Sequence, residues 1–334
     1  MDKVICFGSA GKDVFFPTDE GRIIETPEDL LSQKKIAFEL GAKVRVKDRQ
    51  ESLGGVAANV AVGLSRLGIE TLCASAIGDD ELGDWTRKKL QENKVNVDLV
   101  MINQGRKSDF SAIVVDATTA DRVIFTNYTS SGDFKLNEEN TKPADWFFIG
   151  DIHGKWEDQM EKIFTLAKDG DKKVAFNPRE AGIQEDAPEI IEAIGLSEIV
   201  FVNKDEAIEI VSNMHVDADP ENVNDEKYLI EKLKSLEPKI VVLTDGTRGA
   251  WASDGEHLFH AEAMRVAAVD STGAGDSFTS SFLAAYIKGK SLRECLQWGI
   301  ANSASEVQKY GAIEGLLNEE EILEKAKDIE AKEL

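Results

Sequence analysis

Short apolar runs alternate with amphipathic segments over the middle of the chain, and this alternation limits the fold more than any other feature. The apolar runs are short enough for strands, and the amphipathic segments carry apolar residues at helical spacing. We predict strands at residues 146–149, 174–177, 199–202 and 240–243, and helices at residues 156–167, 205–211 and 226–236. Strands that alternate with helices form right-handed βαβ units. The sequence therefore predicts an α/β fold with a doubly wound, mostly parallel sheet and helices on both faces.

The two ends of the chain add further elements of this kind together with β-rich pieces. Strands are predicted at residues 4–7 and 71–77, a strand pair at 35–46, a hairpin at 112–115 and 122–126, and helices at 55–67, 81–93, 276–288, 291–309 and 319–333. No internal repeat or low-complexity linker divides the chain. We expect one domain over residues 1–334, with a small β-rich lid inserted as segments of about 14–52 and 105–132.

The net charge excludes some classes of partner. It is formally −23 over 334 residues. Such a surface repels phosphate backbones and anionic lipids, so we expect neither nucleic-acid binding nor membrane docking. No apolar run has the roughly 18–20 residues that a membrane helix needs. The N-terminus shows no basic leader followed by an apolar stretch, and so no signal peptide is expected.

The cysteines and histidines follow no metal-ligand or disulfide pattern. Cys6, Cys73 and Cys295 lie far apart, which suits a reducing compartment, and we expect a cytoplasmic protein. Histidines in the strand-like segment near residue 260 are expected at the surface rather than on a metal. The four histidines are His153, His215, His257 and His260.

Residues 270–278 read D-S-T-G-A-G-D-S-F and contain more than a turn or a helix cap requires. The small residues at 273–275 let the backbone approach a ligand closely. An apolar helical run follows, so the loop presents N–H groups at a helix N-terminus, which is an anion site. A simple cap would explain Asp276, but neither the glycines before it nor Asp270.

A carboxylate beside an anion site is suited to phosphoryl transfer. The N–H donors hold the oxygens of the transferred group, and the carboxylate accepts the proton of an attacking hydroxyl. An aspartate, with a reference pKa of about 3.9, is ionised at neutral pH. We therefore expect Asp276 to be a general base.

A second glycine-rich segment, G-G-V-A-A-N at residues 54–59, opens the first long predicted helix. Its paired glycines allow a close backbone approach, and Asn59 can both donate to and accept from a hydroxyl. A plain turn explains the segment equally well. The G-S-A-G at residues 8–11 is not the G-x-G-x-x-G of dinucleotide-binding proteins, which argues against a dehydrogenase.

Two polar segments directly follow predicted strands. N-K-D-E at residues 203–206 lies at a strand's carboxyl end, where open α/β sheets bind ligands. Asn203 and Glu206 could equally form a helix capping box. T-D-G-T-R-G at residues 244–249 could lie against a flat ring or a phosphate, or form a hairpin turn.

Taken in order, these segments resemble the ribokinase-like (PfkB) carbohydrate kinase family over nearly the whole chain. Two signatures are specific: the glycine/asparagine pattern from Gly54 through Asn59 to Gly68 and Gly78, and D-x-x-G-A-G-D at residues 270–276. The resemblance implies a doubly wound sheet with a β-rich lid over a sugar site. It also implies ATP and Mg²⁺ as cofactors, and K⁺ as an activating monovalent cation.

The resemblance further implies roles for single residues. Asp276 resembles the catalytic base, with Gly273, Ala274 and Gly275 as its anion hole. The residues that resemble sugar contacts are Asp13, Gly54, Gly55 and Asn59. Those that resemble the nucleotide pocket are Thr244, Gly246, Gly249 and Asn302. Asn203 and Glu206 match a motif that holds Mg²⁺ largely through water. Asp270 and Thr272, with backbone near Val307 and Gly311, resemble a monovalent-cation loop.

The chain also departs from the family's pattern. The gap from Asp13 to Gly54 is longer than in typical ribokinases, with an extra polar segment near residues 17–34. Ser281 stands where glycine or alanine is usual, and Asp245 where an apolar or small residue is usual. The extra segment near residues 17–34 bears on the identity of the substrate, and Asp245 bears on the affinity for the nucleotide.

The expected function is transfer of the γ-phosphoryl group of MgATP to a hydroxymethyl group of a sugar or sugar-like molecule of the ribose, fructose or ketodeoxy sugar acid type. A nucleoside kinase of the adenosine type is an alternative. From another class, a catalytically inactive sugar- or nucleotide-binding regulator would have lost the base or the anion hole, and both are present. Arg122 in the expected lid could meet an acidic or phosphorylated substrate, or be a solvated strand residue. A homodimer through the open lid edges is also expected.

Overall fold

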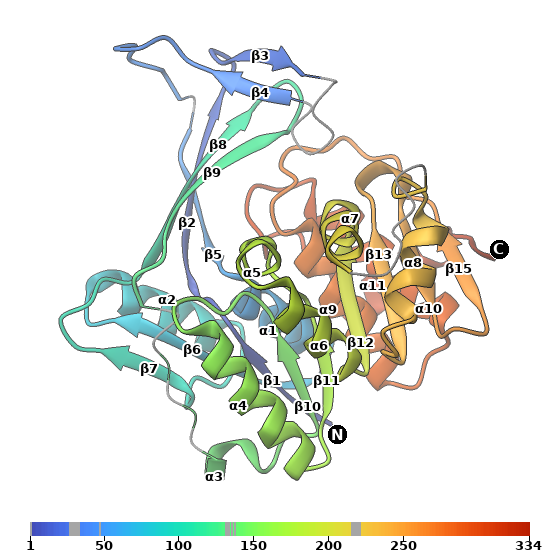
Figure 1. The fold of residues 1–334 in the computed structure, drawn as a ribbon. Helices are drawn as coiled ribbons and strands as arrows, with labels where there is room; N and C mark the ends of the chain where they lie inside the picture. Colours follow the sequence, from blue (N-terminus) through green and yellow to red (C-terminus); the bar gives the residue numbers. More distant parts are fainter. Residues whose placement is uncertain are drawn as a thin grey trace.

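The computed structural model describes residues 2–26, 34–46, 48–130, 134, 136, 138–214 and 222–334. Within these residues the main sheet has ten strands (Figure 1). In sheet order they are β16 (Ala331–Glu333), β15 (Leu258–Ala261), β14 (Ala250–Ser253), β13 (Ile240–Thr244), β12 (Ile199–Asn203), β11 (Lys173–Phe176), β10 (Trp146–Ile149), β1 (Lys3–Phe7), β6 (Glu70–Gly78) and β7 (Val100–Asn103). Neighbours from β13 to β7 pair in parallel, whereas β14, β15 and β16 complete one edge with antiparallel pairs.

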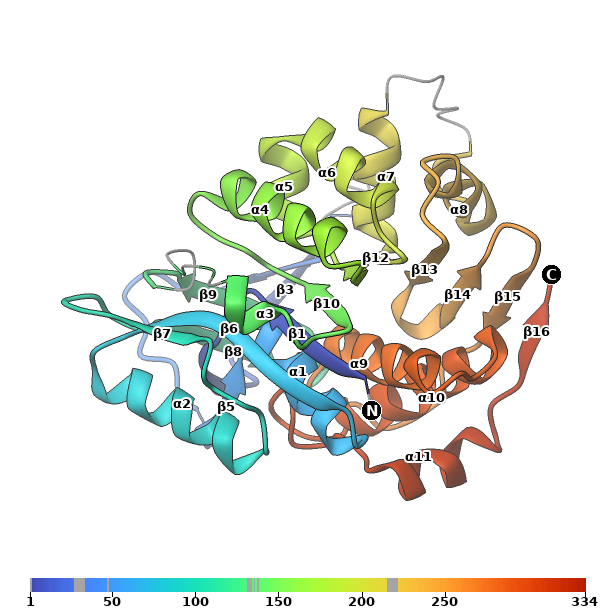
Figure 2. The same cartoon turned by 90° about the horizontal axis from the view of Figure 1, so that it is seen from below.

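Helices cover both faces of this sheet (Figure 2). One face carries α1 (Val56–Arg66), α2 (Glu81–Glu92), α9 (Ala274–Ile287), α10 (Leu292–Glu306) and α11 (Glu319–Ala326). The other carries α4 (Trp156–Asp169), α5 (Glu180–Glu185), α6 (Ala187–Gly195), α7 (Lys204–Asn213) and α8 (Glu226–Lys234), and a short α3 (Glu138–Thr141) precedes β10. The central strands β1 and β10 are almost entirely apolar and buried because both of their faces are covered. The predicted doubly wound sheet is confirmed.

A close contact between α1 and α9 positions the functional site. A Cβ on Gly63 of α1 would lie 2.6 Å from the Cβ of Ser280 on α9, so only glycine permits this approach. The two helices therefore run close together, and the first turn of α1 faces the first turn of α9.

A smaller sheet stands off the main body and forms the lid. In sheet order it consists of β5 (Gln50–Gly54), β2 (Gly11–Thr18), β8 (Asp109–Asp116) and β9 (Arg122–Asn127) in the described part of the chain. β2 and β8 pair in parallel, and the other pairs are antiparallel. Beyond it, β3 (Arg22–Glu25) pairs with β4 (Lys34–Ala37) (Figure 1). The inner face of the four-stranded lid sheet carries Phe15, Ile113 and Val115, which pack against Tyr310 of the body.

Some predicted elements are wrong. The predicted helix at 319–333 ends at Ala326, and β16 follows it because Ile329 and Ala331 bury themselves at the sheet edge. The predicted strand pair at 35–46 is a single strand, β4, whose partner is β3. α5 and α6 are not predicted from the sequence. Of the extra polar segment near 17–34, residues 27–33 lie outside the described residues, as does His215.

Candidate active site

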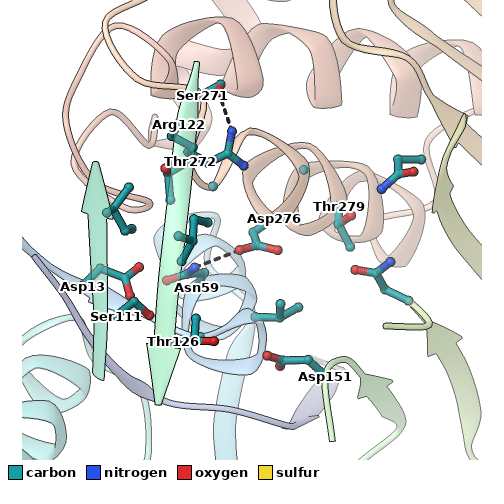
Figure 3. A pocket seen from close by; sticks show the side chains of 18 of the residues that line it. Asp13, Asn59, Ser111, Arg122, Thr126, Asp151, Ser271, Thr272, Asp276 and Thr279 are labelled. Atoms are coloured by element: carbon teal, nitrogen blue, oxygen red, sulfur yellow. Dashed lines mark hydrogen bonds between the residues drawn. The ribbon is translucent and has the colours of Figure 1, made fainter. Parts of the chain in front are cut away.

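A pocket of about 510 Å³ lies where the inner face of the lid meets the body (Figure 3). The first turn of α9 and the carboxyl ends of β12 and β13 contribute to its walls. The predicted site residues that line it are Asp13, Gly55, Asn59, Asn203, Glu206, Thr244, Thr272, Gly273, Gly275 and Asp276. Gly54, Gly246, Gly249, Asp270, Ala274 and Asn302 are not among its lining residues.

The first turn of α9 forms the wall of the pocket at which the sequence predicts an anion site. Its N-cap Gly273 has φ +75°, and a Cβ there would lie 2.5 Å from Ala312 Cα. Both the backbone conformation and the space therefore require glycine. A glycine N-cap has no side chain to bond the N–H groups of the first turn, and Gly273, Gly275 and Asp276 of this turn line the pocket.

Asp276 lies on this turn and accepts a 2.8 Å hydrogen bond at Oδ2 from Asn59 Nδ2. Burial raises the pKa of Asp276 to about 7, against the opposing effect of the Asn59 bond. The carboxylates of Asp151 and Asp13 raise this pKa further, and Arg122 lowers it. A carboxylate with a pKa near neutrality is matched to general-base work at neutral pH. Asn59 Oδ1 is buried without a partner in the described structure, and so it can accept from a hydroxyl group of a ligand.

The lid contributes a polar row opposite Asp276. Asp13, Ser111 and Thr126 are register partners on β2, β8 and β9, and all three line the pocket. Burial raises the pKa of Asp13 to about 6, while a hydrogen bond from Ser111 opposes the rise. A Cβ on Gly54 would collide with the Asp13 carboxylate, so Gly54 makes room for that side chain rather than touching a ligand. The row offers carboxylate and hydroxyl groups to a polyhydroxylated molecule.

Two strand ends of the body add polar residues that the sequence reading missed. Asp151 follows β10 and accepts hydrogen bonds from Ser9 N at 3.1 Å and Ser9 Oγ at 2.5 Å. Asn177 follows β11 and also lines the pocket. Asp151 lies two residues after the predicted strand 146–149, and Asn177 is the last residue of the predicted strand 174–177, so the rule applied to residues 203–206 could have found them.

The lid and the body touch at one end of the pocket. The ring of Tyr128 stacks on the ring of His153 with centroids 3.6 Å apart. Tyr128 follows β9 and His153 follows β10, so this contact joins two parts of the chain that are distant in sequence. His153 Nε2 also lies 3.4 Å from Asp151 Oδ2, so the contact lies beside the wall of the pocket that Asp151 lines.

Asn203 and Glu206 form the capping box of α7. Asn203 N donates to Glu206 Oε2 at 2.8 Å, and Glu206 N donates to Asn203 Oδ1 at 2.8 Å. Burial raises the pKa of Glu206 to about 8, and neighbouring carboxylates add to the rise. Both residues also line the pocket, so the same two side chains cap α7 and are accessible to a ligand.

Of the three residues predicted around the loop after β13, one lines the pocket and two do not. Thr244 lines it, whereas Gly246 is exposed at the start of a short 3₁₀ turn (Gly246–Arg248). Gly249 has φ +94°, and a Cβ there would collide with the carbonyl of Ala261, so its glycine serves the pairing of β14 with β15. The unusual Asp245 forms ion pairs with Arg248 and, at 3.7 Å, with Lys204.

Asn302 corrects one prediction. Its side chain is fully buried in α10, where Nδ2 donates to Ser281 Oγ at 2.6 Å and Oδ1 accepts from Leu317 N at 2.8 Å. The side chain does not line the pocket and its amide is bonded within the protein, so its role in this structure is structural. The unusual Ser281 supplies the acceptor for it.

The Asp270 carboxylate organises the loop that leads into α9. It is fully buried, and Oδ1 accepts from Thr272 N at 3.0 Å and Thr272 Oγ1 at 2.8 Å. Oδ2 accepts from Gly311 N at 3.2 Å, while Val307 O accepts from Asp270 N. A buried carboxylate with only neutral donors around it fits a nearby cation.

The chemistry of the donor set fits Mg²⁺ only through water. Among the described residues, no group of three or more His, Cys, Asp and Glu side chains is arranged to hold a metal. Asn203 and Glu206 supply oxygen donors at the pocket wall, and Mg²⁺ usually keeps several of its waters.

None of the described helices is long and apolar enough to cross a membrane.

A doubly wound sheet, a lid and a buried carboxylate on a glycine-capped helix turn suit a small-molecule kinase. A family model described as pfkB family carbohydrate kinase matches residues 28–319. The chain belongs to this family and is a sugar or nucleoside kinase.

Relatives with different acceptors resemble the chain about equally. It is 29% identical to an ATP-dependent 6-phosphofructokinase of Thermoanaerobacterium thermosaccharolyticum, over 83% of this chain and 86% of that protein. It is 24% identical to a nucleoside kinase of Methanocaldococcus jannaschii, over 97% of both. A crystal structure of a putative Ribokinase II from E. coli in complex with ATP and Mg²⁺ superposes with a TM-score of 0.78 at 21% identity, covering 98% of this chain and 99% of that one. This last similarity shows the ribokinase-like fold.

Proposed function

We propose that the protein transfers the γ-phosphoryl group of MgATP to a hydroxymethyl group of a sugar or sugar-like acceptor. The observation that supports this most directly is Asp276, a carboxylate with a raised pKa on the glycine-capped first turn of α9. It shares a pocket with the polar lid row of Asp13, Ser111 and Thr126. A base, an anion site and a hydroxyl-binding surface therefore meet in one place.

In the proposed reaction the acceptor oxygen attacks the γ-phosphorus, and the bond to the bridging oxygen breaks with its electron pair on ADP. Asp276 accepts the acceptor's proton as the new bond forms. The backbone of residues 273–275 donates hydrogen bonds to the oxygens of the transferred group. Mg²⁺, when bound, neutralises phosphate charge, and Asn203 and Glu206 would hold it through water.

The remaining predicted residues take supporting roles in this proposal. Asp13 and Asn59 bind acceptor hydroxyls, and Gly55 lets the backbone approach them. Thr244 and the exposed backbone at Gly246 lie toward the nucleotide. Asp270 and Thr272 hold a monovalent cation, for which K⁺ is the candidate, behind the anion site.

The three cysteines are free and buried, which supports a cytoplasmic setting.

A homodimer through the lid is part of the proposal. Phe110, Val123 and Phe125 are exposed to 37%, 37% and 62%. They alternate along β8 and β9 with the residues that line the pocket, and therefore lie on the outer face of the lid. Three such side chains on one open sheet favour pairing with a second copy.

The experiment is a measurement of ADP release with MgATP and K⁺ against ribose, fructose, ketodeoxygluconate, inositol, adenosine, cytidine and fructose 6-phosphate. The control variant is Asp276→Asn, which keeps the size of the side chain and removes the base. We expect one acceptor to be turned over and the variant to lose about 10²–10⁴-fold in kcat. An unchanged kcat in the variant would remove Asp276 from the mechanism. Nucleotide binding with no turnover of any acceptor would favour the regulator.

A further inference from the structure

A stack of two aromatic rings forms a wall at the end of the pocket that holds Asp13, Asp151 and Tyr128, which we call its far end. Tyr128 directly follows β9, and its side chain lines the pocket. Its ring lies on that of His153, with centroids 3.6 Å apart and planes at 22°. His153 is not among the lining residues, so it supports the Tyr128 ring from behind. Burial, together with the Asp151 and Asp13 carboxylates, raises the pKa of Tyr128, which places its hydroxyl group near both.

His153 also connects this wall to a carboxylate that faces the pocket. Its Nε2 lies 3.4 Å from Asp151 Oδ2, and Asp151 accepts two further hydrogen bonds from the backbone and side chain of Ser9. The two oxygens of a carboxylate offer about four acceptor positions. At least one position on Asp151 is therefore left for a hydroxyl group of a ligand.

The strand β9 runs along the pocket and limits the length of an acceptor. Arg122, Ile124, Thr126 and Tyr128 line the pocket at every second position, and such side chains lie about 7 Å apart along a strand. Arg122 is bonded to Ser271 in the loop before α9, so the start of β9 lies beside the proposed anion site.

Figure 3 shows Asp276 between the levels of Arg122 and Thr126 along this strand. From the base to the Tyr128 ring there are thus only about one to two steps of about 7 Å, which suits one sugar ring with its hydroxymethyl group.

Charge restricts the acceptor at the same end. Two carboxylates, Asp13 and Asp151, line the far end, whereas Arg122 is the one lysine or arginine among the described lining residues and lies at the other end of β9. A carboxylate or phosphate on the far side of an acceptor would be repelled by these two charges. Hydroxyl groups would instead donate hydrogen bonds to them.

We propose that the stack of Tyr128 on His153 closes the acceptor site behind a single uncharged monosaccharide and excludes nucleosides. This inference rests on the proposed function and narrows its acceptor. In a nucleoside the base is attached across the sugar ring from the hydroxymethyl group. With that group at Asp276, the base would extend into the space that the Tyr128 ring fills. A free monosaccharide presents a hydroxyl group there, which Asp151 can accept.

The test compares kcat/KM for fructose and ribose with kcat/KM for adenosine in the wild type and in Tyr128→Ala. We expect the wild type to prefer a monosaccharide by about 10²-fold or more, and the variant to move this ratio toward adenosine by about 10–10²-fold. His153→Ala should move it in the same direction, because the Tyr128 ring loses its support. Tyr128→Phe keeps the ring and should keep the preference for the monosaccharide.

A structural effect on the lid would lower kcat/KM for every acceptor by one factor and leave the ratio unchanged. Tyr228→Ala is the matched control, because that ring lies on α8 beside Lys232, outside the pocket. Thermal unfolding of each variant reports whether the fold is kept, and His153→Ala tests the wall from the body if Tyr128→Ala does not fold.

Several outcomes overturn the inference and leave the kinase proposal intact. One is a wild type that prefers adenosine or cytidine to every monosaccharide. Another is a wild type that prefers ketodeoxygluconate or fructose 6-phosphate, since both are anionic. An unchanged ratio in folded Tyr128→Ala and His153→Ala also overturns it. A wild type that phosphorylates no acceptor contradicts the kinase proposal and the inference together.

Discussion

Asn59 Nδ2 donates a 2.8 Å hydrogen bond to Asp276 Oδ2, and this bond joins the first turns of α1 and α9 at the centre of the pocket. The bond stabilises the charged form of Asp276, whereas burial favours the protonated form. The resulting pKa of about 7 means that the carboxylate is protonated below this pH and cannot act as a base there.

We therefore expect kcat/KM to fall as the pH drops through about 7. Asn59→Leu removes a hydrogen bond that lowers the pKa of Asp276, so the acidic limb should move to higher pH. The measurement is a pH–rate profile of both proteins. Because Asp13 has a pKa of about 6 in the same pocket, the limb reports the two carboxylates together. A limb at the same pH in the variant would contradict the assignment.

Gly273 and Gly275 form a matched pair for testing the anion turn. Gly273 has φ +75° and a Cβ there would lie 2.5 Å from Ala312 Cα, whereas Gly275 has open space. We expect Gly273→Ala to lower the free energy of unfolding by about 1–3 kcal/mol. Gly275→Ala should leave it unchanged or raise it by about 0.5–1 kcal/mol, since alanine favours the helix. Denaturant unfolding measures both, and equal effects would show that the strain at Gly273 is not real.

Asp270 provides a test of the proposed monovalent cation. Asp270→Asn keeps an acceptor for Thr272 but removes the buried charge. We expect the wild-type rate to rise with KCl and the variant to have a lower rate that no longer responds to it. Initial rates are compared with choline chloride at equal ionic strength. An identical K⁺ response in the two proteins would show that the cation binds elsewhere.

The outer face of the lid provides a test of the dimer. Phe125→Glu places a charge at the most exposed apolar side chain of β9, so we expect the mass measured by light scattering to fall from dimer to monomer. Leu196→Glu is the control, because this residue is 59% exposed at the end of α6, away from the lid. A monomeric wild type at working concentration would remove the dimer from the proposal.

The elements closest to the chemistry were predicted from local sequence alone. The turn at 273–276 and the α1 start at Gly55 are signalled by glycines that the backbone requires at those positions. The same reasoning predicted the parallel strands except β7, because strands buried on both faces are continuous apolar runs.

What the sequence could not supply was the pairing of distant segments. Asp151 faces Asp276 only because β10 and α9 meet across the sheet, and Arg122 meets Ser271 only because the lid folds over. Asn302 looked like a nucleotide contact, yet its amide is consumed by Ser281 and Leu317, which lie on other elements. The residues of β16 were predicted as helix because their short sequence shows no strand pattern. They form a strand because they pair with β15 in the folded protein.

The alternation along β9 gives the lid two unlike surfaces that differ by one step along the backbone. Arg122, Ile124 and Thr126 line the pocket, while Val123 and Phe125 point outward. Deleting or inserting one residue before β9 would exchange these sets, placing Phe125 over the acceptor and Arg122 on the outside. Such a change would exchange the pocket-lining face of β9 and its exposed apolar face, without altering a single residue of the body. In the evolution of this enzyme, the length of the turn between β8 and β9 is therefore less free to vary than its composition.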